Sequence, residues 1–135
     1  MTTDPATSLH SKIQVLLVED NDINRLLMCD YLRYYGYHVV SLTDGEDFFE
    51  TLAYVQPNII LLDLKLRETN GYQILEKLQD NPDFRDIPVI VISGLAFQND
   101  KKRAFELGAR HYLVKPINLN ELNKLIQDEV LRSRS

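Results

Sequence analysis

The chain has 135 residues, 44% of them hydrophobic and 26% charged, which is typical of one compact domain with one core. Its 20 acidic side chains outnumber its 15 basic ones and give a formal charge of -5, so the chain should repel nucleic acid and anionic membranes. The single cysteine, Cys29, excludes an internal disulfide framework and suits a reducing compartment, for which the cytoplasm is the default. No apolar run is long enough to span a bilayer. We therefore expect partners that are proteins or small ligands.

The first half of the chain alternates between strand and helix patterns. The elements expected there, in chain order, are a flexible tail at 1–11, a strand at 13–18, a helix at 22–35, a strand at 37–42 and a helix at 46–54. Gly36 supplies a left-handed stop for the first helix. Pro57 lies just beyond the second helix, and the residue before a proline disfavours helical geometry.

The second half continues the alternation. The elements expected there are a strand at 58–66, a helix at 71–80, a strand at 87–93, a helix at 99–107, a strand at 111–114 and a last helix after Asn118. Gly108 should end the fourth helix, and Asn118 with Glu121 forms a capping-box pattern for the fifth. We expect one domain over 12–131, followed by a frayed end at 132–135.

The order of these elements predicts the fold class. The expected strands are apolar throughout instead of alternating with polar residues, which indicates that both of their faces are covered. Such strands, alternating with helices, are typical of an α/β domain with a doubly wound five-stranded parallel sheet and helices on both faces.

Polar residues capable of chemistry follow the expected strands. In such a sheet, ligands bind outside the carboxyl ends of the strands. The residues at or just beyond those ends are Glu19 and Asp20 after the first strand, Asp63 in the stretch NIILLDLKL (58–66), Ser93 at the end of the fourth and Lys115 after the fifth. We expect these five side chains to meet at one edge of the sheet.

The three carboxylates of this group require a cation. At about 5 Å they would repel one another by roughly 3 kcal/mol per pair at an effective dielectric constant near 20. A few hard oxygen ligands with room for water and a phosphate fit Mg²⁺, for which Mn²⁺ could substitute. Lys115 and Ser93 could then hold phosphoryl oxygens, which leaves Asp63 as a nucleophile that forms an aspartyl-phosphate.

Four motifs carry a resemblance to a known family. LLVEDND (16–22), LLDLKLRETNG (61–71), VIVISG (89–94) and YLVKP (112–116), in this order, resemble the receiver domain of two-component response regulators. The resemblance covers residues 12 to about 131 and implies a flavodoxin-like fold with strand order 2-1-3-4-5. By the same resemblance, Pro116 should follow a cis peptide bond.

The resemblance also implies roles for individual residues. Mg²⁺ would be held by Glu19, Asp20, Asp63 and the backbone carbonyl of Lys65. Asp63 would accept phosphate from the phosphohistidine of a histidine kinase or a phosphotransfer protein. Ser93 and Lys115 would sense the phosphate, and the ring of Tyr112 would swing between exposed and buried positions. The output would be a shift of the fourth helix, fifth strand and fifth helix that a downstream protein effector recognises.

A receiver is a phosphoacceptor and not an enzyme, with at most self-phosphorylation from small donors and self-dephosphorylation. Two positions depart from the common pattern: receivers commonly carry proline where this chain has Arg67, and Lys65 places a positive side chain beside the expected phosphate. Receivers vary at the position of Lys65 in ways that tune dephosphorylation.

Other interpretations remain open. Because no second domain follows residue 131, the chain is either a stand-alone receiver or a receiver excised from a hybrid kinase or larger regulator. A phosphatase with an aspartate nucleophile is disfavoured, because Lys65 stands where that class has a second aspartate. Glu19 and Asp20 would repel the phosphate of a flavin cofactor. A receiver that has lost phosphorylation is disfavoured because every expected site residue is present.

Each site residue also has a purely structural interpretation. The acidic pair could simply open a helix, Asp63 could cap a loop, Ser93 could be a turn residue and Lys115 a surface lysine. Tyr112 could be a half-buried residue of an edge strand. Their joint placement at one sheet edge favours the functional interpretation. The basic run at 101–103 has the pattern of a solvated helix face, and the histidines lack a spacing that suggests metal binding.

Overall fold

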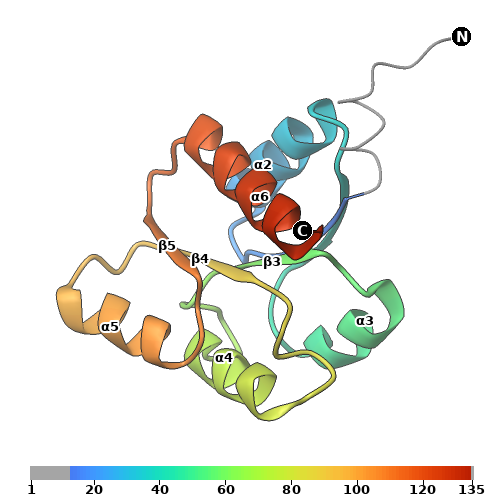
Figure 1. The fold of residues 1–135 in the computed structure, drawn as a ribbon. Coiled ribbons are helices and arrows are strands. Elements are labelled where there is room, and N and C mark those ends of the chain that lie inside the picture. The colour runs from blue at the N-terminus through green and yellow to red at the C-terminus, as the bar shows by residue number, and fades with distance from the viewer. Residues whose placement is uncertain (1–12, 135) are drawn as a thin grey trace, which may run out of the picture.

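The structure, a computed structural model, describes residues 13–134 (Figure 1). The tail expected at 1–11 lies outside the described residues. In chain order the elements are β1 (Gln14–Val18), α2 (Asp22–Tyr34), β2 (His38–Leu42), α3 (Phe48–Val55), β3 (Ile59–Leu62), α4 (Gly71–Asp80), β4 (Val89–Ser93), α5 (Gln98–Glu106), β5 (His111–Val114) and α6 (Leu119–Arg134).

The five strands form one parallel sheet in the order β2-β1-β3-β4-β5. This confirms the expected α/β class and strand order. β1 and β3 lie in the interior of the sheet, so the residues that follow them emerge side by side, whereas β2 forms an outer edge. None of the helices in the described part of the chain combines the length and apolar character needed to cross a membrane.

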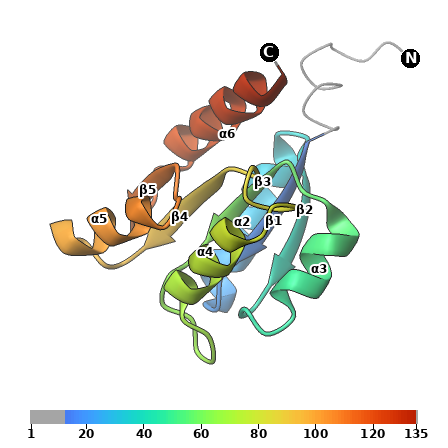
Figure 2. The same cartoon turned by 60° about the horizontal axis from the view of Figure 1, so that its bottom comes forward.

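Helices cover both faces of the sheet (Figure 1). α2 and α6 lie on one face, while α5, α4 and α3 follow one another across the other, as Figure 2 shows from a second direction. The side chains of β1 alternate accordingly: Val15 and Leu17 pack towards α2 and α6, and Leu16 and Val18 towards α3 and α4. The apolar strands therefore serve two cores, as the uninterrupted hydrophobic runs predicted.

Local signals set the helix ends. Asn21 accepts a hydrogen bond from the backbone N of Asn24 (2.9 Å) and caps α2. Gly36 and Gly108 have the positive φ values, 92° and 101°, expected after α2 and α5. Asn118 accepts from the backbone N of Glu121 (3.1 Å), which is one half of the expected capping box. α6 continues through Arg134, beyond the domain end expected at 131.

β3 is shorter than the strand expected at 58–66, because the chain turns directly after Leu62. Lys65 pairs with Asn70 in an isolated antiparallel bridge, and the backbone N of Gly71 donates to the carbonyl of Leu64 at 2.9 Å. The apolar pattern continued past the strand end because Leu64 is buried by this loop and not by the sheet ladder. Asp63 therefore sits at the start of a loop closed by its own hydrogen bonds.

A buried carboxylate joins α6 to the sheet at the end remote from the strand carboxyl ends. Glu129 is 2% exposed, and its Oε1 lies 2.8 Å from Nε2 of His111, the first residue of β5. Nε of Arg110 lies 3.9 Å from the other oxygen. His111, for which the sequence suggested no metal or catalytic role, thus has a partner in the core.

Candidate functional site

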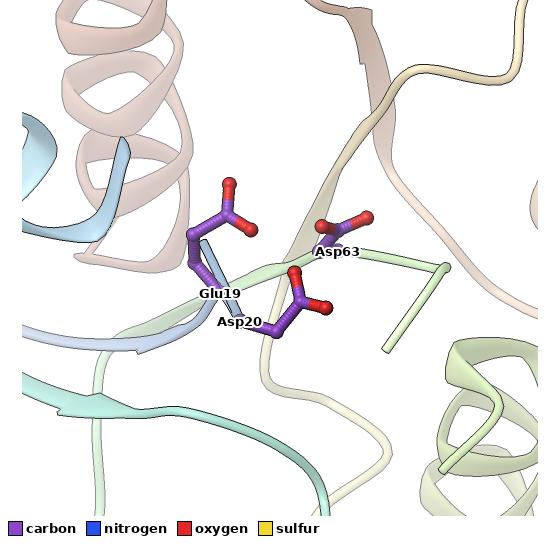
Figure 3. A group of neighbouring side chains, drawn as sticks. All are labelled: Glu19, Asp20 and Asp63. Atoms are coloured by element: carbon purple, nitrogen blue, oxygen red, sulfur yellow. The ribbon is translucent and has the colours of Figure 1, made fainter. Parts of the chain in front are cut away.

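Three carboxylates meet at the carboxyl edge of the sheet. Glu19 and Asp20 extend from the end of β1, and Asp63 extends from the residue after β3 (Figure 3). One oxygen from each lies within 4.8 Å of the others. The expected convergence of these side chains is found, and it follows from the neighbouring positions of β1 and β3 in the sheet.

Burial makes this arrangement electrostatically unfavourable without a counter-charge. Glu19 is 1% and Asp63 4% exposed, and Asp20 is half-buried. Burial raises the pKa of Glu19, the neighbouring Asp63 side chain raises it further, and Lys115 only partly opposes the shift. The cluster therefore favours binding of a cation or a proton.

Lys115 supplies one positive charge. Its Nζ lies 2.8 Å from Glu19 Oε1 and 2.9 Å from Asp63 Oδ2. Burial alone would lower the pKa of Lys115, but its contacts with these two carboxylates outweigh burial and raise it. The ammonium is therefore charged at neutral pH and lies against the Asp63 carboxylate. The peptide bond that precedes Pro116 is cis, as the resemblance implied.

Ser93 and Tyr112 share a backbone neighbour. Ser93 is fully buried, and its Oγ accepts a hydrogen bond from the backbone N of Leu95 (3.1 Å). The Tyr112 hydroxyl donates to the carbonyl of Leu95 (2.7 Å), so the ring lies half-buried against the loop between β4 and α5. Burial raises the pKa of Tyr112, while a hydrogen bond with Ser93 acts in the opposite direction.

The site opens to solvent through a cavity of about 450 Å³. Asp20, Asp63 and Lys115 line it together with Lys65, whose backbone N donates to Asp63 Oδ1 at 3.1 Å. The structure thus brings Lys65 to the edge of the cluster. The remaining lining residues are Asn21, Asn24, Leu66, Arg67 and Gly94.

Sequence reasoning assigned no site role to Asn24, Arg67 and Gly94. Gly94 directly follows Ser93, and Arg67 lies in the loop after Asp63, so proximity to a strand end was the available signal for both. Asn24 lies in the first turn of α2, where the sequence shows only that it belongs to a helix. Its place in the cavity depends on how α2 packs on the sheet.

A second, largely apolar hollow of about 450 Å³ adjoins the cluster between α2 and the loop after β5. Leu27, Met28, Ile117 and Leu119 line it, and Glu19 and Lys115 form its polar end. Ile23, Leu26 and Leu27 of α2 are 70%, 62% and 57% exposed. An apolar surface of this kind beside a polar site is typical of a protein contact.

The donor set at the carboxyl edge suits a hard divalent cation. It consists of carboxylate oxygens from Glu19, Asp20 and Asp63, with no thiolate or imidazole in the cluster found among residues 13–134. Oxygen ligands of this kind are preferred by Mg²⁺ and Mn²⁺. Burial and the neighbouring Asp63 side chain raise the pKa of Glu19, so its ionised form is unfavourable here and a cation would offset that cost.

A family model and a curated relative both match this chain and point to the same family. The model of the response regulator receiver domain matches residues 15–127. The polar-differentiation response regulator DivK of Brucella anthropi is 31% identical over 105 residues, which cover 78% of this chain and 85% of DivK.

Two solved structures of similar proteins contain a bound divalent metal. The receiver domain of the sensor histidine kinase PA1611 from Pseudomonas aeruginosa PAO1, with a magnesium ion coordinated in the active-site cleft, is 29% identical with a TM-score of 0.80; the match covers 87% of this chain and 97% of that chain. The Mn²⁺-bound form of response regulator Rcp1 is 31% identical with a TM-score of 0.72, over 86% of this chain and 90% of that chain.

Proposed function

The chain belongs to the response regulator receiver domain family of two-component signalling, and on this basis we propose that Asp63 is its phosphoacceptor. The observation that carries the proposal is the meeting of the Asp63 carboxylate with Glu19, Asp20 and the Lys115 ammonium at one solvent-accessible cavity. A carboxylate so placed can act as a nucleophile towards phosphorus.

We include a divalent cation in this proposal. Mg²⁺, or Mn²⁺ in its place, would be held by Glu19, Asp20, Asp63 and the backbone carbonyl of Lys65. When bound, the ion offsets carboxylate repulsion and neutralises charge on a phosphoryl group. Its presence in the similar receiver structures and the oxygen-only donor set support this assignment.

The transfer needs one nucleophile and one leaving group. An oxygen of Asp63 attacks phosphorus, an O–P bond forms, and the N–P bond of the donor phosphohistidine breaks. The electron pair of that bond stays on the imidazole nitrogen, which ends as a neutral or reprotonated ring. Lys115 already lies 2.9 Å from Asp63 Oδ2, so its ammonium can contact a phosphoryl oxygen after a small movement. No further covalent step by the protein is needed.

The switch would run through the loop between β4 and α5. The Ser93 hydroxyl, now hydrogen-bonded to the Leu95 backbone, would turn towards the phosphoryl group as a donor. Because Tyr112 bonds the same residue through its carbonyl, a shift of Leu95 would change the Tyr112 contact and the α5, β5 and α6 surface. This surface carries exposed Phe97 and Phe105 and would be recognised by a downstream protein effector.

A histidine kinase or a phosphotransfer protein is the proposed donor. Its histidine must reach the cavity that leads to Asp63, and Ile23, Leu26 and Leu27 present an apolar surface on the adjoining helix. This exposed apolar surface can be buried against the donor protein when the two proteins dock. The net negative charge disfavours direct contact with nucleic acid.

The test is intact mass spectrometry after incubation with acetyl phosphate and Mg²⁺. We expect the wild type to gain one phosphoryl group that hydroxylamine removes and that does not form when EDTA is present. Asp63→Asn should gain none, whereas Asp83→Asn, which alters an exposed aspartate after α4, should be labelled like the wild type. Equal labelling of the wild type and Asp63→Asn would refute the phosphoacceptor assignment.

The same preparation separates a phosphoacceptor from a phosphatase. We expect no sustained release of p-nitrophenol from p-nitrophenyl phosphate, because Lys65 offers no carboxylate to act as acid and base beside Asp63. Multiple turnover that is lost in Asp63→Asn would favour the phosphatase instead.

A further inference from the structure

A second cation lies at the mouth of the Asp63 cavity. Arg67, in the loop between β3 and α4, lines the same cavity as Asp20, Asp63 and Lys115. Arg67 is exposed, and Asn21 and Asn24 at the start of α2 line the same cavity.

Lys115 and Arg25 have partners near this site, whereas the Arg67 and Lys65 side chains have none among residues 13–134. Lys115 contacts two carboxylates. Arg25 bonds Asp22 at 2.7 Å and the carbonyl of Glu19 at 3.0 Å. Within residues 13–134, by contrast, neither an ion pair nor a hydrogen bond engages the exposed Arg67 guanidinium. It is available to an anion that enters the cavity.

With a divalent cation bound, the charges around the cavity would suit a dianionic phosphoryl group. The cavity lining includes two carboxylates, Asp20 and Asp63, and three cations, Lys65, Arg67 and Lys115. A divalent metal would add to the positive side, and the phosphoryl group on Asp63 would bring further negative charge to the mouth. Lys115 approaches Asp63 from the Glu19 side, so a phosphoryl oxygen that faces the cavity opening could accept from a further donor.

Building on the proposed function of Asp63, we propose that Arg67 is a phosphate-binding residue that contacts the outward oxygens of the phosphoryl group, both on Asp63 and on a small anionic donor. A guanidinium presents two parallel N–H groups that match two phosphate oxygens, which a lysine cannot do. Lys65 is a second exposed cation in the same lining, but a point charge with freely rotating donors fixes an anion less firmly.

The experiment measures binding of a phosphoryl mimic and of metal separately. Beryllium fluoride forms a tetrahedral complex on a carboxylate oxygen, and fluorine NMR detects the bound fluoride directly. At saturating Mg²⁺ we expect Arg67→Gln to weaken beryllium fluoride binding about fivefold, the size expected for a solvent-screened charged contact. The beryllium fluoride affinity of Arg67→Lys should fall between those of the wild type and Arg67→Gln, because lysine keeps the charge but lacks the paired donors.

Two controls exclude a general loss of charge or structure. Arg85→Gln removes an equal charge from the exposed loop before β4, at the other edge of the sheet, and should bind the mimic like the wild type. Mg²⁺ affinity without fluoride should be unchanged or higher in Arg67→Gln, because a positive charge near the metal is removed. A damaged site would instead bind both ligands less well.

The outcomes separate this inference from the function on which it rests. If the wild type binds the mimic and labels at Asp63, but Arg67→Gln binds it as tightly as Arg85→Gln, the Arg67 role is wrong and the phosphoacceptor remains. Weaker Mg²⁺ binding in Arg67→Gln would likewise overturn the Arg67 role. If the wild type neither binds the mimic nor labels at Asp63, both proposals fall.

Discussion

Glu19 illustrates how single residues of this site are held in an unfavourable state. Its carboxylate is 1% exposed, adjoins Asp63 and is only partly compensated by Lys115. A group that is more easily protonated in the fold than in the unfolded chain destabilises the fold once it is ionised. The ionised cluster thus lowers the stability of the metal-free protein, and a bound cation would restore that stability.

We therefore predict that Glu19 reduces stability at neutral pH in metal-free protein. Because the folded pKa of Glu19 lies above the unfolded one, its contribution is fully present below the unfolded pKa of about 4.5 and is lost as pH rises through the folded pKa. The stability difference between wild type and Glu19→Gln should therefore shift in favour of the variant as pH rises from 4 to 7. Urea unfolding in EDTA measures it.

Magnesium should reverse the stability order of the wild type and Glu19→Gln at neutral pH. A ligand that binds only the folded state adds about 2.7 kcal/mol at one hundred times its dissociation constant. The wild type should gain more from Mg²⁺ than Glu19→Gln, which lacks one proposed ligand. Parallel pH profiles in EDTA, or equal gains from Mg²⁺, would contradict this account of the cluster.

The loop between β3 and α4 decides the geometry of the site at the scale of elements. Lys65 bridges Asn70, whose side chain caps α4 by accepting from the backbone N of Tyr72 at 2.9 Å. A Cβ on Gly71 would lie 2.5 Å from the Leu64 Cα and 2.8 Å from the Asp63 carbonyl oxygen. Only glycine allows the start of α4 to approach Asp63 this closely.

Gly71→Ala should therefore displace the loop and with it Asp63. We expect a loss of about 2 kcal/mol in the free energy of unfolding, the range for an atom forced into packed surroundings, and slower labelling by acetyl phosphate. Gly94→Ala is the matched control for stability, because a Cβ there meets nothing within 4 Å. Equal urea midpoints for the two variants would show that the loop can accommodate a Cβ at residue 71.

At the scale of the whole molecule, α6 packs against α2 and the segment that follows α2. The Tyr37 hydroxyl donates to Asn123 of α6, and that of Tyr31 donates to Asn120 at 2.7 Å. Leu122, Ile126 and Val130 of α6 enter the core beneath α2. A shift of α6 on phosphorylation would have to keep or exchange these contacts, so they limit how far the helix can move.

Tyr37 should make stability depend on alkaline pH. Burial raises the pKa of Tyr37 to about 12, above the ordinary value near 10, so its contribution is fully present below pH 10 and is lost as pH rises towards 12. The loss should be on the order of 2 kcal/mol. Urea unfolding between pH 9.5 and 11.5 should show a steeper loss of stability in the wild type and in Tyr34→Phe, which alters an exposed tyrosine, than in Tyr37→Phe. An unchanged slope in Tyr37→Phe would show that other groups cause it.

Much of the fold and the site could be predicted from local pattern. The bounds of α4 and β5 match the expected 71–80 and 111–114, because Asn70, Gly71 and a short apolar run are strong local signals. Apart from the end of β3, the other ends lie within two residues of the expected positions, since helix and strand ends depend on neighbours. The end of β3 was misplaced, because Leu64 and Leu66 continue an apolar pattern that belongs to a loop.

The sequence by itself determined the class of fold and which residues lie at the strand ends, because hydrophobic periodicity and residue chemistry are local properties of the chain. Only the tertiary structure decided the separations within the site, the contacts of Lys115 with two carboxylates, the place of Arg67 in the cavity lining and the pairing of His111 with Glu129. These contacts join residues on different elements. Their distances are set by how the helices and loops pack on the sheet, which no short stretch of sequence encodes.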